Sequence, residues 1–177
     1  RPVEWQEDSS YLPVTTGKDL YQPRDVDDRY FQNTGGHLVW AMHACWLIYR
    51  GSMDDDMLKD TIYPIMKRAA NYQIHRLEKR EGKYHAPISH SPEYGDAPDA
   101  NYELSMLRWV CHAIISAGTR LKVEDSELVK YRDILSGLTD YQGDERGYMV
   151  GTDMPFDKPH RHWCHLQMMH PLQLVTG

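Results

Sequence analysis

The sequence predicts an all-α fold built from stacked helical hairpins. Helical spacing of apolar residues recurs along the chain, long polar loops connect some of these segments, and no alternation of strands and helices indicates a parallel sheet. The 177 residues are 41% hydrophobic and 26% charged, which is an ordinary globular balance and enough for one core. We therefore expect one domain over residues 1–177, with residues 1–35 as an irregular entry segment rich in Pro, Asp and Gly.

Five segments carry the helical pattern: residues 37–50, 54–80, 101–121, 125–138 and a last one that begins near Pro159. The first is apolar almost all the way round, so we expect it to be buried on most sides, with Gly51 at its end. The second has aspartates in its first turn and basic residues in its last, as the helix dipole favours, and Pro64 should break or kink it. Pro159 suits the first turn of the fifth helix.

Charge and apolar patterning exclude two classes of partner. The formal net charge is −6 and no element concentrates Lys and Arg, so we expect no nucleic-acid partner. The longest apolar stretch, residues 38–49, is interrupted by His43 and falls short of the roughly 20 residues that a membrane span needs. Three cysteines, Cys45, Cys111 and Cys164, lie far apart, which favours packed thiols over a disulfide scaffold.

The loop at residues 82–99 contains the most pointed candidate for catalysis, Glu93. Pro92 fixes the backbone just before it, so its carboxyl group is presented from a stiff loop. Aromatic neighbours such as Tyr94 would desolvate the carboxyl group and raise its pKa, as a general acid requires. On composition alone a structural role, in which Glu93 caps or bridges helices, is the commoner one for such a residue.

The Gly-rich loop at residues 141–158 contains the second candidate, Asp157. It lies just before the predicted helix start at Pro159, where a carboxylate is favoured as a cap by the helix dipole. Its functional alternative is a general base that activates water. Both roles remain open at this point.

Three histidines that follow, His160, His162 and His165, suggest a metal site. On a helix His160 and His162 would lie some 200° apart, at about 100° per residue, so the three cannot converge on one ion. Two of them would need further ligands from elsewhere. We expect no metal and no cofactor; instead these histidines and Arg161 should hold the loop and donate hydrogen bonds to substrate hydroxyls or to carboxylates.

Two motifs in order resemble glycoside hydrolase family 95, which contains α-L-fucosidases and enzymes that act on α-L-galactosides. They are Ser91-Pro92-Glu93, followed by a helix that opens at residues 98–101, and the segment His160-Arg161-His162-Trp163-Cys164-His165-Leu166. The resemblance covers roughly residues 30–175. The family pattern has Ser where this chain has Cys164 and an aliphatic residue where it has Trp163.

The resemblance implies an (α/α)6 toroid and an inverting glycosidase in which Glu93 is the general acid, Asp157 the general base, and Asn33 the residue that positions base and water. Where the family has two asparagines, this chain has Asn33 followed by Thr34 and glycines. The partner would be an oligosaccharide or polysaccharide, and the enzyme would be secreted or periplasmic. The chain begins without a methionine or a signal-like segment and has fewer helices than a full barrel, so we expect a partial domain that is inactive alone.

Several aromatic residues near the two loops are candidates for stacking on sugar faces: Tyr30, Phe31, Trp40, Tyr94, Tyr102 and Trp163. Core packing is the alternative for each of them and the expected role of Trp109. A thiol nucleophile formed by Cys164 and His165 is disfavoured, because neighbours on a helix project in different directions. Two other functions remain open: a polysaccharide lyase on a helical toroid, and a non-catalytic carbohydrate-binding helical domain.

Overall fold

The computed structural model describes residues 3–12, 34–123 and 126–175. Among these residues, four helices longer than ten residues dominate: α2 (His37–Ser52), α4 (Tyr63–His75), α5 (Asn101–Leu121) and α6 (Glu127–Gly137). All four lie where helical spacing predicts them. Within the expected entry segment, Val3–Trp5 form a short 3-10 helix, η1, and residues 13–33 lie outside the described part.

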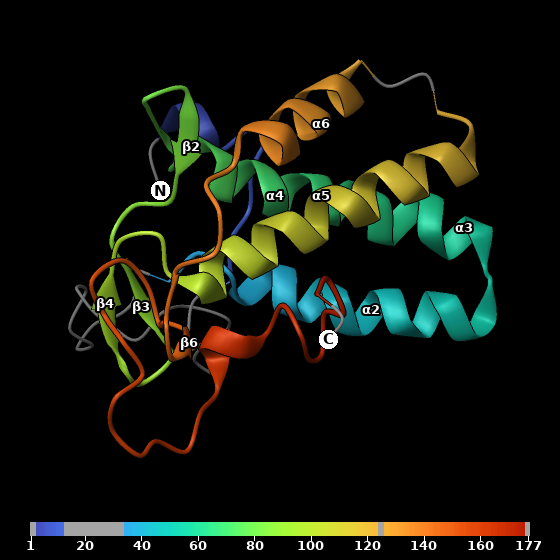
Figure 1. Ribbon diagram of the computed structural model, residues 1–177. Coiled ribbons are helices and arrows are strands. Elements are labelled where there is room, and N and C mark those ends of the chain that lie inside the picture. The colour runs from blue at the N-terminus through green and yellow to red at the C-terminus, as the bar shows by residue number, and fades with distance from the viewer. Residues whose placement is uncertain (1–2, 13–33, 124–125, 176–177) are drawn as a thin grey trace.

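The central helix is α5, which lies between α2 on one side and α6 on the other, with α4 beside it (Figure 1). Its apolar side chains recur at helical spacing and are buried, among them Leu104, Leu107, Val110 and Ile114. Burial of such side chains is the main source of stability for a helical layer. In the parts of the chain that are described, no helix combines the length and apolarity that crossing a membrane would take.

The second predicted helix is interrupted where Pro64 was expected to disturb it. Asp54 caps its start by accepting a hydrogen bond from the Met57 N–H at 2.9 Å, and α3 (Asp55–Met57) leads into a π-helical turn, η2 (Leu58–Ile62). Pro64 then lies in the first turn of α4, where its missing N–H does no harm. The helix ends at His75, so the prediction that it continues to residue 80 is wrong.

Three short antiparallel hairpins are present among the described residues; the first begins in the last residues of the predicted second helix, and the other two replace stretches that the sequence predicts as loops. They pair β1 (Glu78–Arg80) with β2 (Lys83–His85), β3 (Ser89–Ser91) with β4 (Gly95–Ala97), and β5 (Gly143–Asp144) with β6 (Gly147–Tyr148). In the first hairpin the two connecting residues, Glu81 and Gly82, both have positive φ, 50° and 82°, as a type I′ turn requires.

The fifth predicted helix is wrong: the chain from residue 155 to 163 is irregular, and only Cys164–Leu166 form a short 3-10 helix, η3. The side chains of this segment turn to the β3–β4 hairpin, as the stacked rings of Tyr94 and Phe156 show.

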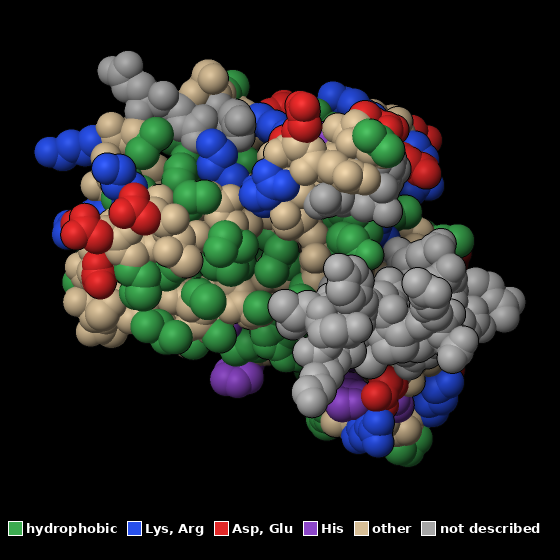
Figure 2. Space-filling model, turned by 180° about the vertical axis from the view of Figure 1, so that it is seen from behind, with side chains coloured by type: hydrophobic (Ala, Val, Ile, Leu, Met, Phe, Trp, Pro, Cys, Tyr) green, Lys and Arg blue, Asp and Glu red, His purple; other side chains and the backbone are tan. Residues whose placement is uncertain are grey.

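The expectation that α2 is buried on most sides is also wrong. Only one of its faces packs against α4 and α5, through residues that include Val39 and Met42. The opposite face leaves Leu47 and Ile48 50% and 62% exposed. Figure 2 shows hydrophobic side chains along the lower part of the molecule, at the height at which α2 runs in Figure 1.

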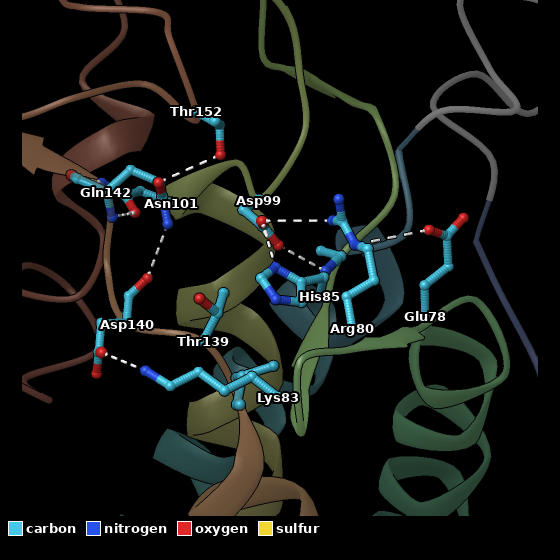
Figure 3. A network of polar contacts seen from close by, with 12 residues as sticks. Glu78, Arg80, Lys83, His85, Asp99, Asn101, Thr139, Asp140, Gln142 and Thr152 are labelled. Atoms are coloured by element: carbon cyan, nitrogen blue, oxygen red, sulfur yellow. Dashed lines mark hydrogen bonds and ion pairs between the residues drawn. The ribbon is translucent and has the colours of Figure 1, made fainter.

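A network of polar contacts fastens the loops to the start of α5 (Figure 3). Asp99 is buried and accepts hydrogen bonds from the Ala86 N–H and the His85 ring, both at 2.8 Å. Asn101, fully buried, donates to the carbonyls of Gln142 and Met149 and accepts from the Gln142 N–H. The β1–β2 hairpin and the loop at residues 141–158 are thereby fixed relative to α5.

Candidate active site

A cavity of about 220 Å³ opens where the β3–β4 hairpin meets the N-terminal end of α2. In Figure 1 this hairpin lies beside the first turns of α2 and α5. The cavity is lined by side chains from three separate parts of the chain: Thr34, His37, Trp40, His90, Pro92, Glu93, His162 and Cys164. The structure therefore brings both sequence motifs together in one place.

Glu93 lies at the tip of the β3–β4 hairpin in a constrained conformation. The Tyr94 N–H donates to the Ser91 carbonyl at 2.9 Å, which closes a turn with Pro92 and Glu93 in its centre. Glu93 has a φ of 59°, a value that favours Gly or Asn and strains other side chains. This left-handed residue completes the turn, and its side chain lines the cavity.

Two cationic or polar side chains from the C-terminal segment meet the Glu93 carboxylate. Arg161 donates to it, and His162 Nε2 lies 3.3 Å from the same oxygen. The hydrogen bond from Arg161 lowers the pKa of Glu93, and the charge of Arg161 and contact with His162 act in the same direction. The expected rise in the pKa of Glu93 is thus wrong for this arrangement, because its side chain is 44% exposed and its carboxylate is ion-paired rather than desolvated.

The opposite wall of the cavity is a short segment held by a buried carboxylate. Glu103 of α5 accepts hydrogen bonds from the Gly35 N–H at 2.6 Å and from Gln73 Nε2 at 3.1 Å, and Arg76 lies 3.3 Å from it. A side chain at Gly36 would come within 2.9 Å of the Tyr102 hydroxyl oxygen, so this position needs glycine for close packing. Thr34 and His37 are presented to the cavity from either side of this fixed segment.

Cys164 closes part of the cavity as an inert thiol. Burial raises its pKa to about 11, and burial likewise raises that of Cys111, in α5, to about 12. A thiol with so high a pKa has almost no thiolate at neutral pH. This agrees with the sequence-based argument against a nucleophile formed by Cys164 and His165.

We expect native Cys164 and Cys111 to resist iodoacetamide at pH 8, because their thiols stay protonated well above that pH and are shielded from solvent. The half-buried Cys45 serves as an internal comparison. Peptide mass spectrometry before and after unfolding in urea measures the labelling. Rapid modification of Cys164 in the folded protein would contradict the burial described here.

Asp157 does not line this cavity. Its carboxylate accepts a hydrogen bond from the Tyr94 hydroxyl at 2.9 Å, and its own N–H donates to that hydroxyl. Lys158 covers the Tyr94 ring at 4.7 Å and Phe156 stacks on it. In this geometry Asp157 and Tyr94 fasten the irregular segment to the Glu93 hairpin.

The other sequence candidates are divided between the cavity and its surroundings. Trp40 and His162 line it, and Arg161 reaches it through Glu93. His160 contacts His162 and the edge of the Tyr94 ring, outside the lining. Tyr102 is a core residue, whereas Trp163 is largely exposed. Asn33, Tyr30 and Phe31 lie outside the described residues.

The sequence reading missed Thr34, His37, His90 and the anchoring carboxylate Glu103. The signal for the first two was the pair Gly35-Gly36 directly before an apolar helix, which marks close backbone packing. The sequence does not indicate the anchoring role of Glu103, since an acidic residue in a first helical turn is common.

His160 and His162 do not lie on a helix, so the 200° separation expected for them does not apply. In the irregular segment His160 Nδ1 is engaged with the backbone of His162 instead. Within residues 3–12, 34–123 and 126–175, no group of three His, Cys, Asp or Glu side chains is arranged to hold a metal ion.

Comparison with known proteins agrees with the motifs that meet at this cavity. A comparison with curated proteins finds no match. The family model for the glycosyl hydrolase family 95 catalytic domain matches residues 14–177, which is nearly the whole chain. The chain therefore belongs to glycosyl hydrolase family 95.

Proposed function

We propose that this domain hydrolyses a glycosidic bond, with Glu93 as the general acid. The observation that carries the proposal is the position of Glu93: a tight hairpin turn holds its carboxyl group at a cavity that also offers an aromatic face, Trp40, and polar side chains. An aromatic face beside hydroxyl-binding groups suits a sugar ring. Family membership supports the same reaction class.

In the proposed reaction Glu93 gives its proton to the glycosidic oxygen as the bond from that oxygen to the anomeric carbon breaks. Water adds to the anomeric carbon from the opposite face and loses a proton to a base. Glu93 must be protonated to act, so the contact with Arg161 has to open when substrate enters. We propose an inverting outcome, an α-L-fucoside or α-L-galactoside as substrate, and a complete (α/α)6 toroid, all from the family.

Glu93 is the one carboxylate among the described residues that line the cavity, so the general base has to come from outside this lining. Asp157 remains a prediction from the sequence, and its hydrogen bond with Tyr94 would have to break before it activated water at the cavity. Asn33, predicted to position that water, directly precedes Thr34, which lines the cavity. We therefore rest the mechanism on Glu93 and propose that Asp157 chiefly orders the hairpin.

The cavity lining disfavours the lyase alternative. A lyase that removes a proton next to a uronate carboxylate needs a cation to neutralise that group. Among the described lining residues there is no Lys or Arg, the only carboxylate is Glu93, and Arg161 reaches the cavity only through its contact with that carboxylate. While Arg161 is paired with Glu93, a neutral sugar fits this lining better than a uronate.

The test is an assay of the intact protein that contains this chain on aryl glycosides and on neutral oligosaccharides. Release of a reducing sugar without a product that absorbs in the near ultraviolet supports hydrolysis. An unsaturated product would support the lyase, and tight glycan binding without turnover would support a binding domain. Proton NMR of the first product formed gives the stereochemistry.

Removal of Arg161 should shift the pH profile of hydrolysis. Because Arg161 lowers the pKa of Glu93, the variant Arg161→Gln should raise that pKa and keep the acid protonated to higher pH. We expect the basic limb of the kcat/KM profile to move upward in pH. The matched control is Arg120→Gln, because Arg120 pairs with Asp55 at the far end of α5. This variant should leave the basic limb of the kcat/KM profile in place. A downward shift, or none, in Arg161→Gln would contradict the pairing.

A further inference from the structure

We propose that Thr34 and His37 form a subsite that binds hydroxyl groups of the sugar whose bond is cleaved. The inference rests on the proposed function and names two specificity-determining residues on the wall opposite Glu93. Both side chains line the same cavity as Glu93 and come from the segment that Glu103 holds in place.

The Thr34 side chain carries a buried hydroxyl group that lacks a hydrogen-bond partner among the described residues. Only 5% of the residue is exposed, and its Oγ1 forms no hydrogen bond within the described part of the chain. A buried hydroxyl without a partner costs free energy, so folding alone does not explain a threonine here. A ligand hydroxyl in the cavity would supply the missing partner.

His37 offers a second polar atom at the first turn of α2. Its Nδ1 is buried, and no described group forms a well-aligned hydrogen bond with it. Burial lowers the pKa of His37, while the Glu103 carboxylate and the Thr34 carbonyl act in the opposite direction. A neutral imidazole nitrogen and a threonine hydroxyl together complement a group that both donates and accepts, which is the property of a sugar hydroxyl.

The position of the subsite follows from the anchoring of its backbone. Glu103 accepts hydrogen bonds from the Gly35 N–H and from Gln73. These bonds fix the backbone between Thr34 and His37. The two polar atoms are therefore preorganised and lose little freedom when a ligand binds. A site built to bond a hydroxyl discriminates strongly against the analogue that lacks it.

The experiment compares Thr34→Val with wild type in the intact protein, on an aryl glycoside that is hydrolysed and on its series of monodeoxy analogues. Valine has the shape of threonine without the hydroxyl. We expect kcat/KM on the parent glycoside to fall about tenfold or more, and one deoxy analogue to be hydrolysed equally by both proteins. Thr119→Val is the control, because Thr119 is exposed on α5 and bonds the Ile115 carbonyl.

Stability gives a readout that separates binding from folding. Removal of an unpaired buried hydroxyl should leave the melting temperature of Thr34→Val unchanged or higher. For His37, Asn places a polar atom near Nδ1 and should retain more activity than Leu. A fall in melting temperature with equal losses on every substrate would overturn the subsite and show a structural role.

Calorimetry of L-fucose and L-galactose binding, measured beside hydrolysis, distinguishes failure of the subsite from failure of the proposed function. Hydrolysis by wild type with an unchanged deoxy profile in Thr34→Val overturns the subsite and leaves the function standing. Monosaccharide binding that Thr34→Val weakens, in a protein that hydrolyses nothing, supports the subsite and removes the hydrolase. No binding of either sugar to wild type overturns the subsite.

Discussion

Glu93→Gln should reduce turnover of unactivated glycosides by about 10²- to 10⁴-fold, the usual contribution of a general acid. Glutamine fills the same space and still accepts a hydrogen bond from Arg161, but it has no proton to give to the leaving oxygen. The melting temperature should be nearly unchanged, because the contact with Arg161 lies at the surface. Initial rates and thermal unfolding of the intact protein measure the two effects.

Glu81→Gln is the matched control for this substitution. Glu81 is also a glutamate with positive φ at the tip of a hairpin, but it connects β1 and β2 and is absent from the lining of the cavity. Its variant should hydrolyse substrate at the wild-type rate. Equal activity of Glu93→Gln and wild type would remove Glu93 from the mechanism.

Asn101→Ala should cause a large loss of stability, about 3 kcal/mol or more. The Asn101 side chain is fully buried and makes three hydrogen bonds of 2.7–2.8 Å to the backbone of Gln142 and Met149 (Figure 3). Alanine leaves the Gln142 N–H and the Met149 carbonyl without this partner, while the Gln142 carbonyl still accepts from the Met149 N–H, and each unsatisfied buried group costs about 1–3 kcal/mol. Chemical denaturation with urea measures the change.

Gln142→Ala is the control variant, because Asn101 bonds the backbone of Gln142 and not its side chain. It removes the hydrogen bonds of the Gln142 side chain with Thr152 and with the Asp140 carbonyl but keeps both backbone hydrogen bonds to Asn101. We expect it to cost about 1 kcal/mol, because one of the two lost bonds is partly buried and the other is exposed. Similar losses in the two variants would show that Asn101 does not anchor this loop.

Periodicity predicted the helices well because their apolar positions are fixed by packing. α5 begins at Asn101 and ends at Leu121 as expected, since its buried stripe and its connections are unambiguous. The missing fifth helix shows the opposite case. Pro159 indicates a helix start, but Arg161 and His162 contact Glu93 of the hairpin, and these tertiary contacts override a local preference.

The site was predictable in part. Glu93, His162 and Trp40 share the cavity, as motif and composition suggested. The contact with Arg161, which reverses the expected shift in the pKa of Glu93, depends on two segments 68 residues apart and could not be read from local sequence. The same holds for Glu103, whose importance arises only from its contact with the Gly35 backbone.

The most direct test of Glu93 as the general acid is the dependence of Glu93→Gln on the leaving group. A glycosyl fluoride departs without needing a proton from the enzyme, whereas an alkyl glycoside of the same sugar needs one. We predict that Glu93→Gln retains most of the wild-type rate on the fluoride and loses about 10²-fold or more on the alkyl glycoside. Equal losses on both substrates would contradict proton donation by Glu93.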